Sequence, residues 1–173
     1  MKSLALTSNP FAVFLAASSL SLAVPAMADV KVMAATACDP SIPVFRDHIT
    51  GQMSNHNLTV GGEMNCVLLR DNPSAKIVQI QVSVVDNSSV LLGNGDVSCN
   101  ARAFNRFGTQ SSIGATVKTT GTNSAGTVLT LPIPALTFVD GSYVVKCILP
   151  RRGAGDANSG VASIRYVESD PAP

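Results

Sequence analysis

Two adjacent arginines, Arg151 and Arg152, run into the glycine-rich segment RRGAGDANSG and are the first candidates for chemistry. The backbone N–H groups of such a loop, beside a cation, can bind phosphate or another anion. Phosphate-binding loops, however, place their glycines directly before a helix, as in G-x-G-x-x-G. Here the spacing differs, and an alternating apolar segment follows Gly160. We therefore expect 151–160 to be a solvent-exposed connection between strands; the alternative is an arginine pair that contacts an anionic partner.

Candidates for catalysis or metal binding form no recognised pattern. The two histidines, His48 and His56, lie in the same region as Asp39 and Asp47, but their spacing matches no known metal-ligand motif. The chain also lacks the G-x-S-x-G and H-E-x-x-H motifs. We therefore expect a non-enzymatic protein without catalytic residues, cofactor or metal. A metal site at the histidines and a hydrolase with scattered catalytic residues stay open as alternatives.

Four cysteines, Cys38, Cys66, Cys99 and Cys147, are the residues most able to form covalent links. An even number of cysteines in an exported chain is typical of disulfides, and here predicts two of them. Zinc is the alternative, although no C-x-x-C pair is present. Three disulfide pairings are possible, and we favour Cys38–Cys66 with Cys99–Cys147.

The first 28 residues have the features of a secretory signal peptide. Lys2 precedes an uncharged apolar run at 11–24, and Ala26-Met27-Ala28 matches a cleavage site. The run is shorter than the roughly 20 residues that a membrane-spanning helix needs. We expect cleavage after Ala28, an exported mature chain of residues 29–173, and no membrane span after cleavage. An N-terminal membrane anchor is the alternative.

The net charge of the mature chain indicates whether an anionic partner, such as nucleic acid, is expected. Without Lys2, 11 basic residues balance 11 acidic ones, so the net charge is zero. A neutral protein exerts no broad attraction on nucleic acid or anionic lipid. We therefore expect no nucleic-acid partner.

Alternation of apolar and polar residues with a period of two is the dominant pattern, and it predicts strands. It is clearest in the segments 76–86, 96–105, 142–150 and 160–168. In 76–86 we predict a core face of Val78, Ile80, Val82 and Val84, with Ile77 outside it. The predicted core faces of the other three segments are Val97, Cys99, Ala101 and Ala103; Tyr143, Val145, Cys147 and Leu149; and Ala162, Ile164 and Tyr166.

Weaker strand signals and turns fill the rest of the chain. The weaker candidates are 31–35, 57–60, 63–69, 90–92, 112–119 and 127–131, whereas 39–55 is predicted to be a long loop. No window has a sustained apolar repeat of 3.6 residues. Short strands separated by turns predict an all-β fold. We expect a single antiparallel β-sandwich, jelly-roll or immunoglobulin-like, over 29–173.

A small aromatic cluster could bind a ligand. Phe104 and Phe107 flank Arg106 in AFNRFG and could form an exposed patch, although the chain has no tryptophan. Packing of these rings in the core is the competing interpretation.

Several cysteine-bearing motifs carry a resemblance. NCVLLRDN, DVSCNAR, YVVKCILP and SGVASIRYVE, in this order, resemble a group of short, uncharacterised exported bacterial proteins. The resemblance covers most of the mature chain. It implies export, a disulfide-bonded β domain and a periplasmic or extracellular location, and it implies no active site.

The expected function is a non-enzymatic structural or interaction role, exerted by surface contact in the bacterial envelope or outside the cell. The polar strand faces are rich in Ser, Thr, Asn and Gln and poor in charge, which suits contact with an envelope or extracellular protein or a glycan. One alternative is a small-ligand or glycan-binding module centred on Phe104, Arg106 and Phe107. A further alternative is a fimbrial-type subunit that donates 29–37, DVKVMAATA, to a neighbour's sheet.

Overall fold

The computed structural model describes residues 28–41, 43–47, 50–89, 95–136 and 140–169. Its strands are β1 (Asp29–Ala34), β2 (Asp39–Pro40), β3 (Val44–Asp47), β4 (Gln52–Asn55), β5 (Gly62–Leu68), β6 (Lys76–Asp86), β7 (Ser98–Phe104), β8 (Gln110–Ile113), β9 (Val117–Lys118), β10 (Asn123–Thr130), β11 (Ser142–Leu149) and β12 (Ser159–Ser169), and a short 3-10 helix, η1, spans Ala35–Ala37. The predicted signal peptide except Ala28, the predicted strand 90–92 and His48 lie outside the described residues.

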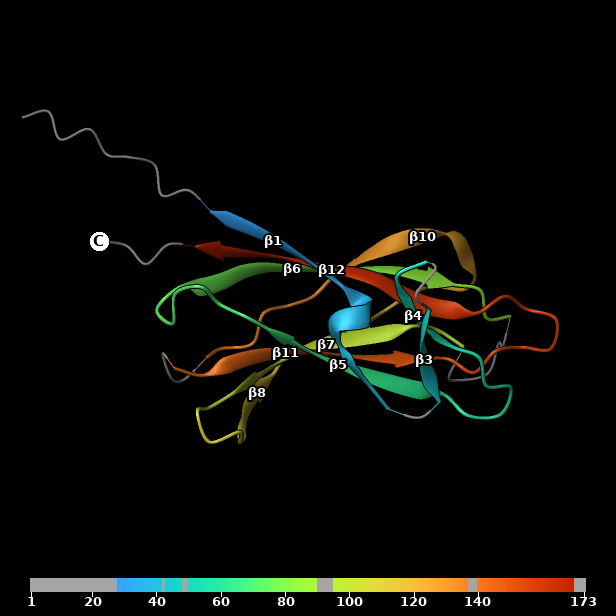
Figure 1. The fold of residues 1–173 in the computed structure, drawn as a ribbon, viewed down its shortest axis with the longest axis horizontal. Coiled ribbons are helices and arrows are strands. Elements are labelled where there is room, and N and C mark those ends of the chain that lie inside the picture. The colour runs from blue at the N-terminus through green and yellow to red at the C-terminus, as the bar shows by residue number, and fades with distance from the viewer. Residues whose placement is uncertain (1–27, 42, 48–49, 90–94, 137–139, 170–173) are drawn as a thin grey trace, which may run out of the picture.

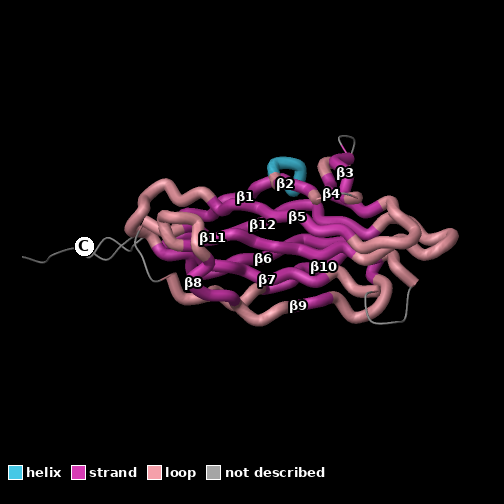
Figure 2. Tube along the Cα trace, turned by 90° about the horizontal axis from the view of Figure 1, so that it is seen from below, coloured by secondary structure: helices cyan, strands magenta, loops and turns pink. Residues whose placement is uncertain are grey.

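Two antiparallel sheets pack face to face (Figures 1 and 2). In the first, sheet A, the strand order is β10-β6-β12-β4-β3, and β1 also pairs with β12. In the second, sheet B, the order is β2-β5-β11-β7-β8, and β9 also pairs with β7. The predicted all-β antiparallel sandwich is confirmed. No helix in the described ranges is long and apolar enough to cross a membrane.

The core lies between the two inner faces and is built by the predicted alternation. The residues at its centre are at most 1% exposed. Strands β6 and β12 of sheet A contribute Ile80, Val82, Val84, Val161 and Ile164. Strands β7 and β11 of sheet B contribute Cys99, Ala101, Ala103, Val145, Cys147 and Leu149, together with Val97 just before β7. Because successive strand residues point to opposite faces, these buried residues recur at every second position along β7 and β11. The core faces predicted for 96–105 and 142–150 are therefore confirmed.

Two β-bulges between β6 and β12 change the predicted faces of these strands. The register shifts near the start of β6, so Ile77 is buried at 3% exposure and Val78 is 53% exposed, the reverse of the prediction. A second shift lies between Val161 and Ser163. Val161 is therefore buried, and the predicted core residue Ala162 is only partly buried. An extra residue in one strand inverts the alternation beyond it.

Three weaker predictions from the sequence are wrong. The expected loop at 39–55 contains β2, β3 and β4, of which β3 and β4 form an antiparallel pair. The expected strand at 57–60 is a turn, because the Asn57 side chain accepts hydrogen bonds from the N–H groups of Thr59 and Val60. The expected strand at 112–119 is divided into β8 and β9 where the Gly114 N–H bonds to the Ala101 carbonyl.

The N-terminal strand β1 pairs within its own chain. It runs antiparallel to β12 from the pair Asp29–Glu168 to the pair Ala34–Ser163. The ammonium of Lys31 lies 2.8 Å from both Glu168 Oε1 and Asp71 Oδ1, and this contact holds the pKa of the Asp71 carboxyl below its usual value. The strand that a fimbrial-type subunit would donate to a neighbour is thus already paired with β12 of its own chain.

Candidate functional site

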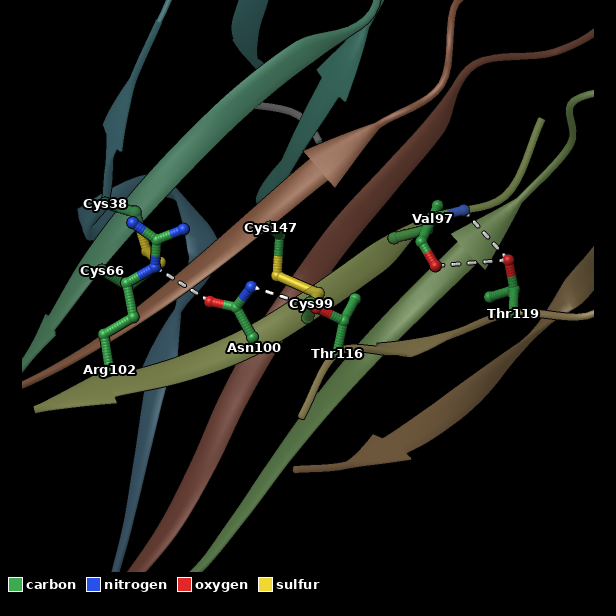
Figure 3. The surroundings of a disulfide bond; sticks show 9 residues. All are labelled: Cys38, Cys66, Val97, Cys99, Asn100, Arg102, Thr116, Thr119 and Cys147. Carbon is green, nitrogen blue, oxygen red and sulfur yellow. Dashed lines mark hydrogen bonds between the residues drawn. A yellow bond between two sulfur atoms is a disulfide. The ribbon is translucent and has the colours of Figure 1, made fainter. Parts of the chain in front are cut away.

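Both disulfides are buried against the inner face of sheet B (Figure 3). The predicted pairs Cys38–Cys66 and Cys99–Cys147 are confirmed. Cys99 and Cys147 are direct neighbours in the register of β7 and β11, with Cα atoms 4.1 Å apart. The Cys99–Cys147 disulfide therefore links two strands of sheet B, whereas the Cys38–Cys66 disulfide links β5 of sheet B to the residue between η1 and β2.

The predicted contact residues fall at opposite ends of the sandwich. Arg151 and Arg152 follow the end of β11, on the right in Figure 1, whereas Phe104 pairs with Ser142 at the start of the same strand. Arg106 and Phe107 lie beyond Phe104 in the β7–β8 connection. The structure therefore does not unite these five residues in one site.

The β11–β12 connection contains a carboxylate, that of Asp156, which is hydrogen-bonded within the protein. The carboxylate of Asp156 accepts a hydrogen bond from the N–H of Ser89 at 2.7 Å. The N–H and hydroxyl of Ser89, the backbone of Gly153 and the nearby Arg152 all hold the pKa of Asp156 below its usual value. A Cβ at Gly153 would overlap this carboxylate and come within 2.9 Å of Ser89 Oγ. The carboxylate of Asp156 thus occupies the space beside the Cα of Gly153.

The prediction that 151–160 is solvent-exposed is wrong in part. Gly153, Ser159 and Gly160 are buried, because β12 starts at Ser159 and a Cβ at Gly160 would come within 2.7 Å of the Met53 carbonyl oxygen. Arg151 is exposed, as expected, but Arg152 is partly buried. The loop is therefore packed against neighbouring segments rather than extended into solvent.

We expect Asp156→Asn to destabilise the protein at about pH 7 and to have progressively less effect as the pH falls below about 4. The folded-state pKa of Asp156 is lower than its unfolded-state pKa. Its stabilisation is therefore fully present above the unfolded pKa and is lost as the pH falls through the folded pKa. Urea unfolding of both proteins across this range measures the difference. A constant difference at all pH values would contradict the assignment.

His56 contacts a serine, a pairing that the sequence interpretation missed. Ser54 Oγ lies 2.9 Å from His56 Nε2, and the Phe45 ring packs edge-on against the imidazole. A catalytic serine must reach its substrate and needs a base that a third group orients. Ser54 is only 4% exposed, and no described carboxylate contacts His56. The described residues contain no group of three or more potential metal ligands.

A buried carboxylate joins four segments of the fold. Asp86 is fully buried at the end of β6. Its Oδ1 accepts hydrogen bonds from the Ser88 N–H at 3.1 Å and the Ser159 hydroxyl at 3.0 Å. Its Oδ2 accepts hydrogen bonds from the Val97 N–H at 3.0 Å and the Thr119 hydroxyl. Because every donor is part of the chain, the arrangement is structural.

In the aromatic cluster at the β7–β8 connection, the Arg106 guanidinium lies over the ring of Phe107. Phe107 is 75% exposed, but the Arg106 guanidinium carbon lies 4.7 Å from its ring centroid. Arg106 also lies 3.6 Å from the Asp140 carboxylate, and Phe104 is only partly exposed. The three residues therefore do not present two open rings on which a sugar could stack.

The outer face of sheet B carries an apolar patch that crosses four strands. Register pairs connect Val67 of β5 with Val144 of β11, Val144 with Arg102 of β7, and Arg102 with Ile113 of β8. Residues paired in this way lie on the same face of a sheet. Leu69, just after the end of β5, and Phe104, at the end of β7, lie two residues beyond Val67 and Arg102. Together these residues form the sheet B patch: Val67, Leu69, Arg102, Phe104, Ile113 and Val144. The exposed fractions of Val67, Leu69 and Ile113 are 47%, 71% and 51%.

Arg102 is held in a fixed orientation within this patch. Its Nε donates a hydrogen bond to Asn100 Oδ1 at 3.0 Å, and Asn100 Nδ2 donates to Thr116 Oγ1 at 3.3 Å (Figure 3). Among the described residues, nothing forms a hydrogen bond or ion pair with the two terminal nitrogens of Arg102. The guanidinium therefore keeps two parallel donors for a partner.

Comparisons with known proteins show distant likeness in fold. No family model and no curated protein matches the chain. A family two carbohydrate esterase from Cellvibrio japonicus superposes with a TM-score of 0.47 at 12% identity, over 85% of this chain and 36% of that one. An Arthrobacter globiformis T6 isomalto-dextranase complexed with panose superposes with a TM-score of 0.45 at 13% identity, over 79% and 23%. The chain spans about a third and a quarter of these proteins, and neither assigns it a site.

Proposed function

We propose that the protein is an exported, non-enzymatic binding protein that acts through the sheet B patch on another envelope or extracellular protein. The observation that carries this proposal is the continuous row of Val67, Val144, Arg102 and Ile113 across four strands. Apolar groups gathered on an exposed face, with polar residues around them, are typical of interaction sites. The two disulfides and the signal-like N-terminus support export, because disulfides persist in oxidising compartments.

The chemistry of the patch favours a protein partner that presents apolar side chains around a carboxylate. Val67, Leu69 and Ile113 would lose apolar surface to water on contact. The two terminal nitrogens of Arg102 match the two oxygens of a carboxylate, and arginine is enriched at the centre of protein interfaces. A glycan is less well matched, because Phe104 is the single aromatic residue in the patch and is only partly exposed.

Ile113→Glu is expected to weaken capture of the partner at least tenfold, because binding would bury an unpaired carboxylate in an apolar interface. The immobilised mature protein is incubated with envelope and culture fractions of the cells that produce it. Val128→Glu is the matched control, because Val128 is 53% exposed on β10 of sheet A.

The two variants separate the patch from a general effect of added charge. The proposal requires one protein that the wild type and Val128→Glu retain equally and that Ile113→Glu loses. Both variants should keep the thermal stability of the wild type within the small range of surface substitutions. Equal retention by all three proteins would show that the patch is not the contact surface.

A further inference from the structure

A cavity lies at the end of the sandwich where β11 begins, and the proposed function does not use it. Its volume is about 430 Å³, within the usual range for small-molecule sites. It lies between the β5–β6 connection and the segment that follows β10. Residues that define its chemistry are Arg70, Lys76, Ile77, Ile133, Leu136 and Tyr143.

One buried side chain lining the cavity has an unused hydrogen-bonding group. Tyr143 is 4% exposed, yet its hydroxyl has no hydrogen-bond partner among the described residues. The second tyrosine, Tyr166, is equally buried, but its hydroxyl donates to the Leu69 carbonyl at 2.7 Å. The hydroxyl is not among the buried polar atoms without a partner, so it is accessible from the cavity. Tyr143 is thus a donor that a bound acceptor would satisfy.

The lining of the cavity is positively charged and contains no carboxylate. Arg70 donates to the carbonyl oxygens of Pro73, Ala75 and Gly141, which fixes its guanidinium beside the cavity. Lys76 is exposed, and its ammonium has no ion pair or hydrogen bond within the described part of the chain. The neighbouring acid, Asp71, is engaged by Lys31 instead. Two cationic residues, Arg70 and Lys76, therefore line the cavity together with mostly apolar side chains.

We infer that this cavity binds a small amphipathic carboxylate, with its apolar body against Ile77, Ile133 and Leu136 and its carboxylate on the Tyr143 hydroxyl and the Lys76 ammonium. A carboxylate accepts hydrogen bonds and carries the charge that the lysine complements, and charge-assisted hydrogen bonds are the stronger kind. Apolar walls with a few convergent polar groups are typical of small-ligand sites.

Decanoate is a suitable probe, because the chain has two tyrosines and no tryptophan. In protein labelled with ¹³C at the tyrosine ring, decanoate below its micelle concentration should shift the Tyr143 signal and leave the Tyr166 signal in place. Tyr143→Phe should weaken binding, measured by calorimetry, about tenfold. Lys76→Gln should weaken it as well, and decanol, which lacks the charge, should be insensitive to Lys76→Gln.

Controls keep the test independent of folding. Tyr143→Phe removes a hydroxyl without a partner and should unfold like the wild type, whereas Lys118→Gln, an exposed lysine on β9, should bind decanoate normally. Failure of decanoate to shift Tyr143, equal shifts at both tyrosines, or unchanged binding by Lys76→Gln would each overturn the inference. Ile113→Glu should leave decanoate binding unchanged, so the result is independent of the sheet B patch.

Discussion

Asp86→Ala is expected to lower the free energy of unfolding by about 3 to 5 kcal/mol, because each buried donor left without a partner costs roughly 1 to 3 kcal/mol. The fully buried carboxylate accepts hydrogen bonds from two backbone N–H groups, of Ser88 and Val97, and from two hydroxyls, of Ser159 and Thr119. Alanine removes all four acceptor contacts at once. Equilibrium urea unfolding at neutral pH measures the loss.

Asp140→Ala is the matched control for this substitution. The Asp140 side chain is 50% exposed and pairs with Arg106, which is 62% exposed, so its loss should cost less than about 1 kcal/mol. Asp86→Asn should fall between the two, since the amide keeps one acceptor oxygen but turns an NH₂ group towards two donors. Equal stability of Asp86→Ala and Asp140→Ala would show that the buried network does not stabilise the fold.

Removal of the Cys99–Cys147 disulfide is expected to have an effect of similar size, about 2 to 5 kcal/mol. The bond closes a separation of 48 residues and joins Cys99, near the start of β7, to Cys147, near the end of β11. Without it, the unfolded chain gains conformational freedom that folding must then remove. Denaturant unfolding of Cys99→Ala/Cys147→Ala measures the change, and the variant leaves no new free thiol at this position.

Two controls separate the cross-link from packing and from local sequence changes. Cys99→Ala/Cys147→Val restores part of the lost volume and should still be clearly less stable than the wild type. Arg151→Ala, only four residues after Cys147, changes an exposed side chain and should shift stability by no more than about 0.5 kcal/mol. A double cysteine variant as stable as Arg151→Ala would contradict the expectation.

Local alternation predicted the core faces of β7 and β11 correctly because burial there follows the pleat of a single strand. The core face of β11, from Tyr143 to Leu149, needs no knowledge of its neighbours. The exchanged positions of Ile77 and Val78 depend instead on the register between β6 and β12, which no local pattern contains. Strands as short as β3 and β4 gave no signal, because four residues carry too little alternation.

The candidate surfaces were less predictable than the fold. The sheet B patch exists because β5, β11, β7 and β8 lie side by side, an order that differs from their order in the sequence. The Asp156 carboxylate was overlooked because its partner, Ser89, is 67 residues away. Tyr143 was correctly predicted to be buried, but a missing hydrogen-bond partner becomes visible only when the surroundings of the hydroxyl are known.

Site-specific photo-cross-linking in the producing cells tests the central claim, that the sheet B patch is the contact surface, most directly. A photoreactive phenylalanine analogue is placed at Ile113 on the patch or at Val128 on sheet A, two positions of nearly equal exposure. The account predicts that illumination links position 113 to one discrete protein partner, that position 128 gives no such product, and that Arg102→Ala reduces the yield at 113. Equal products at both positions, or a product at 128 alone, would contradict it.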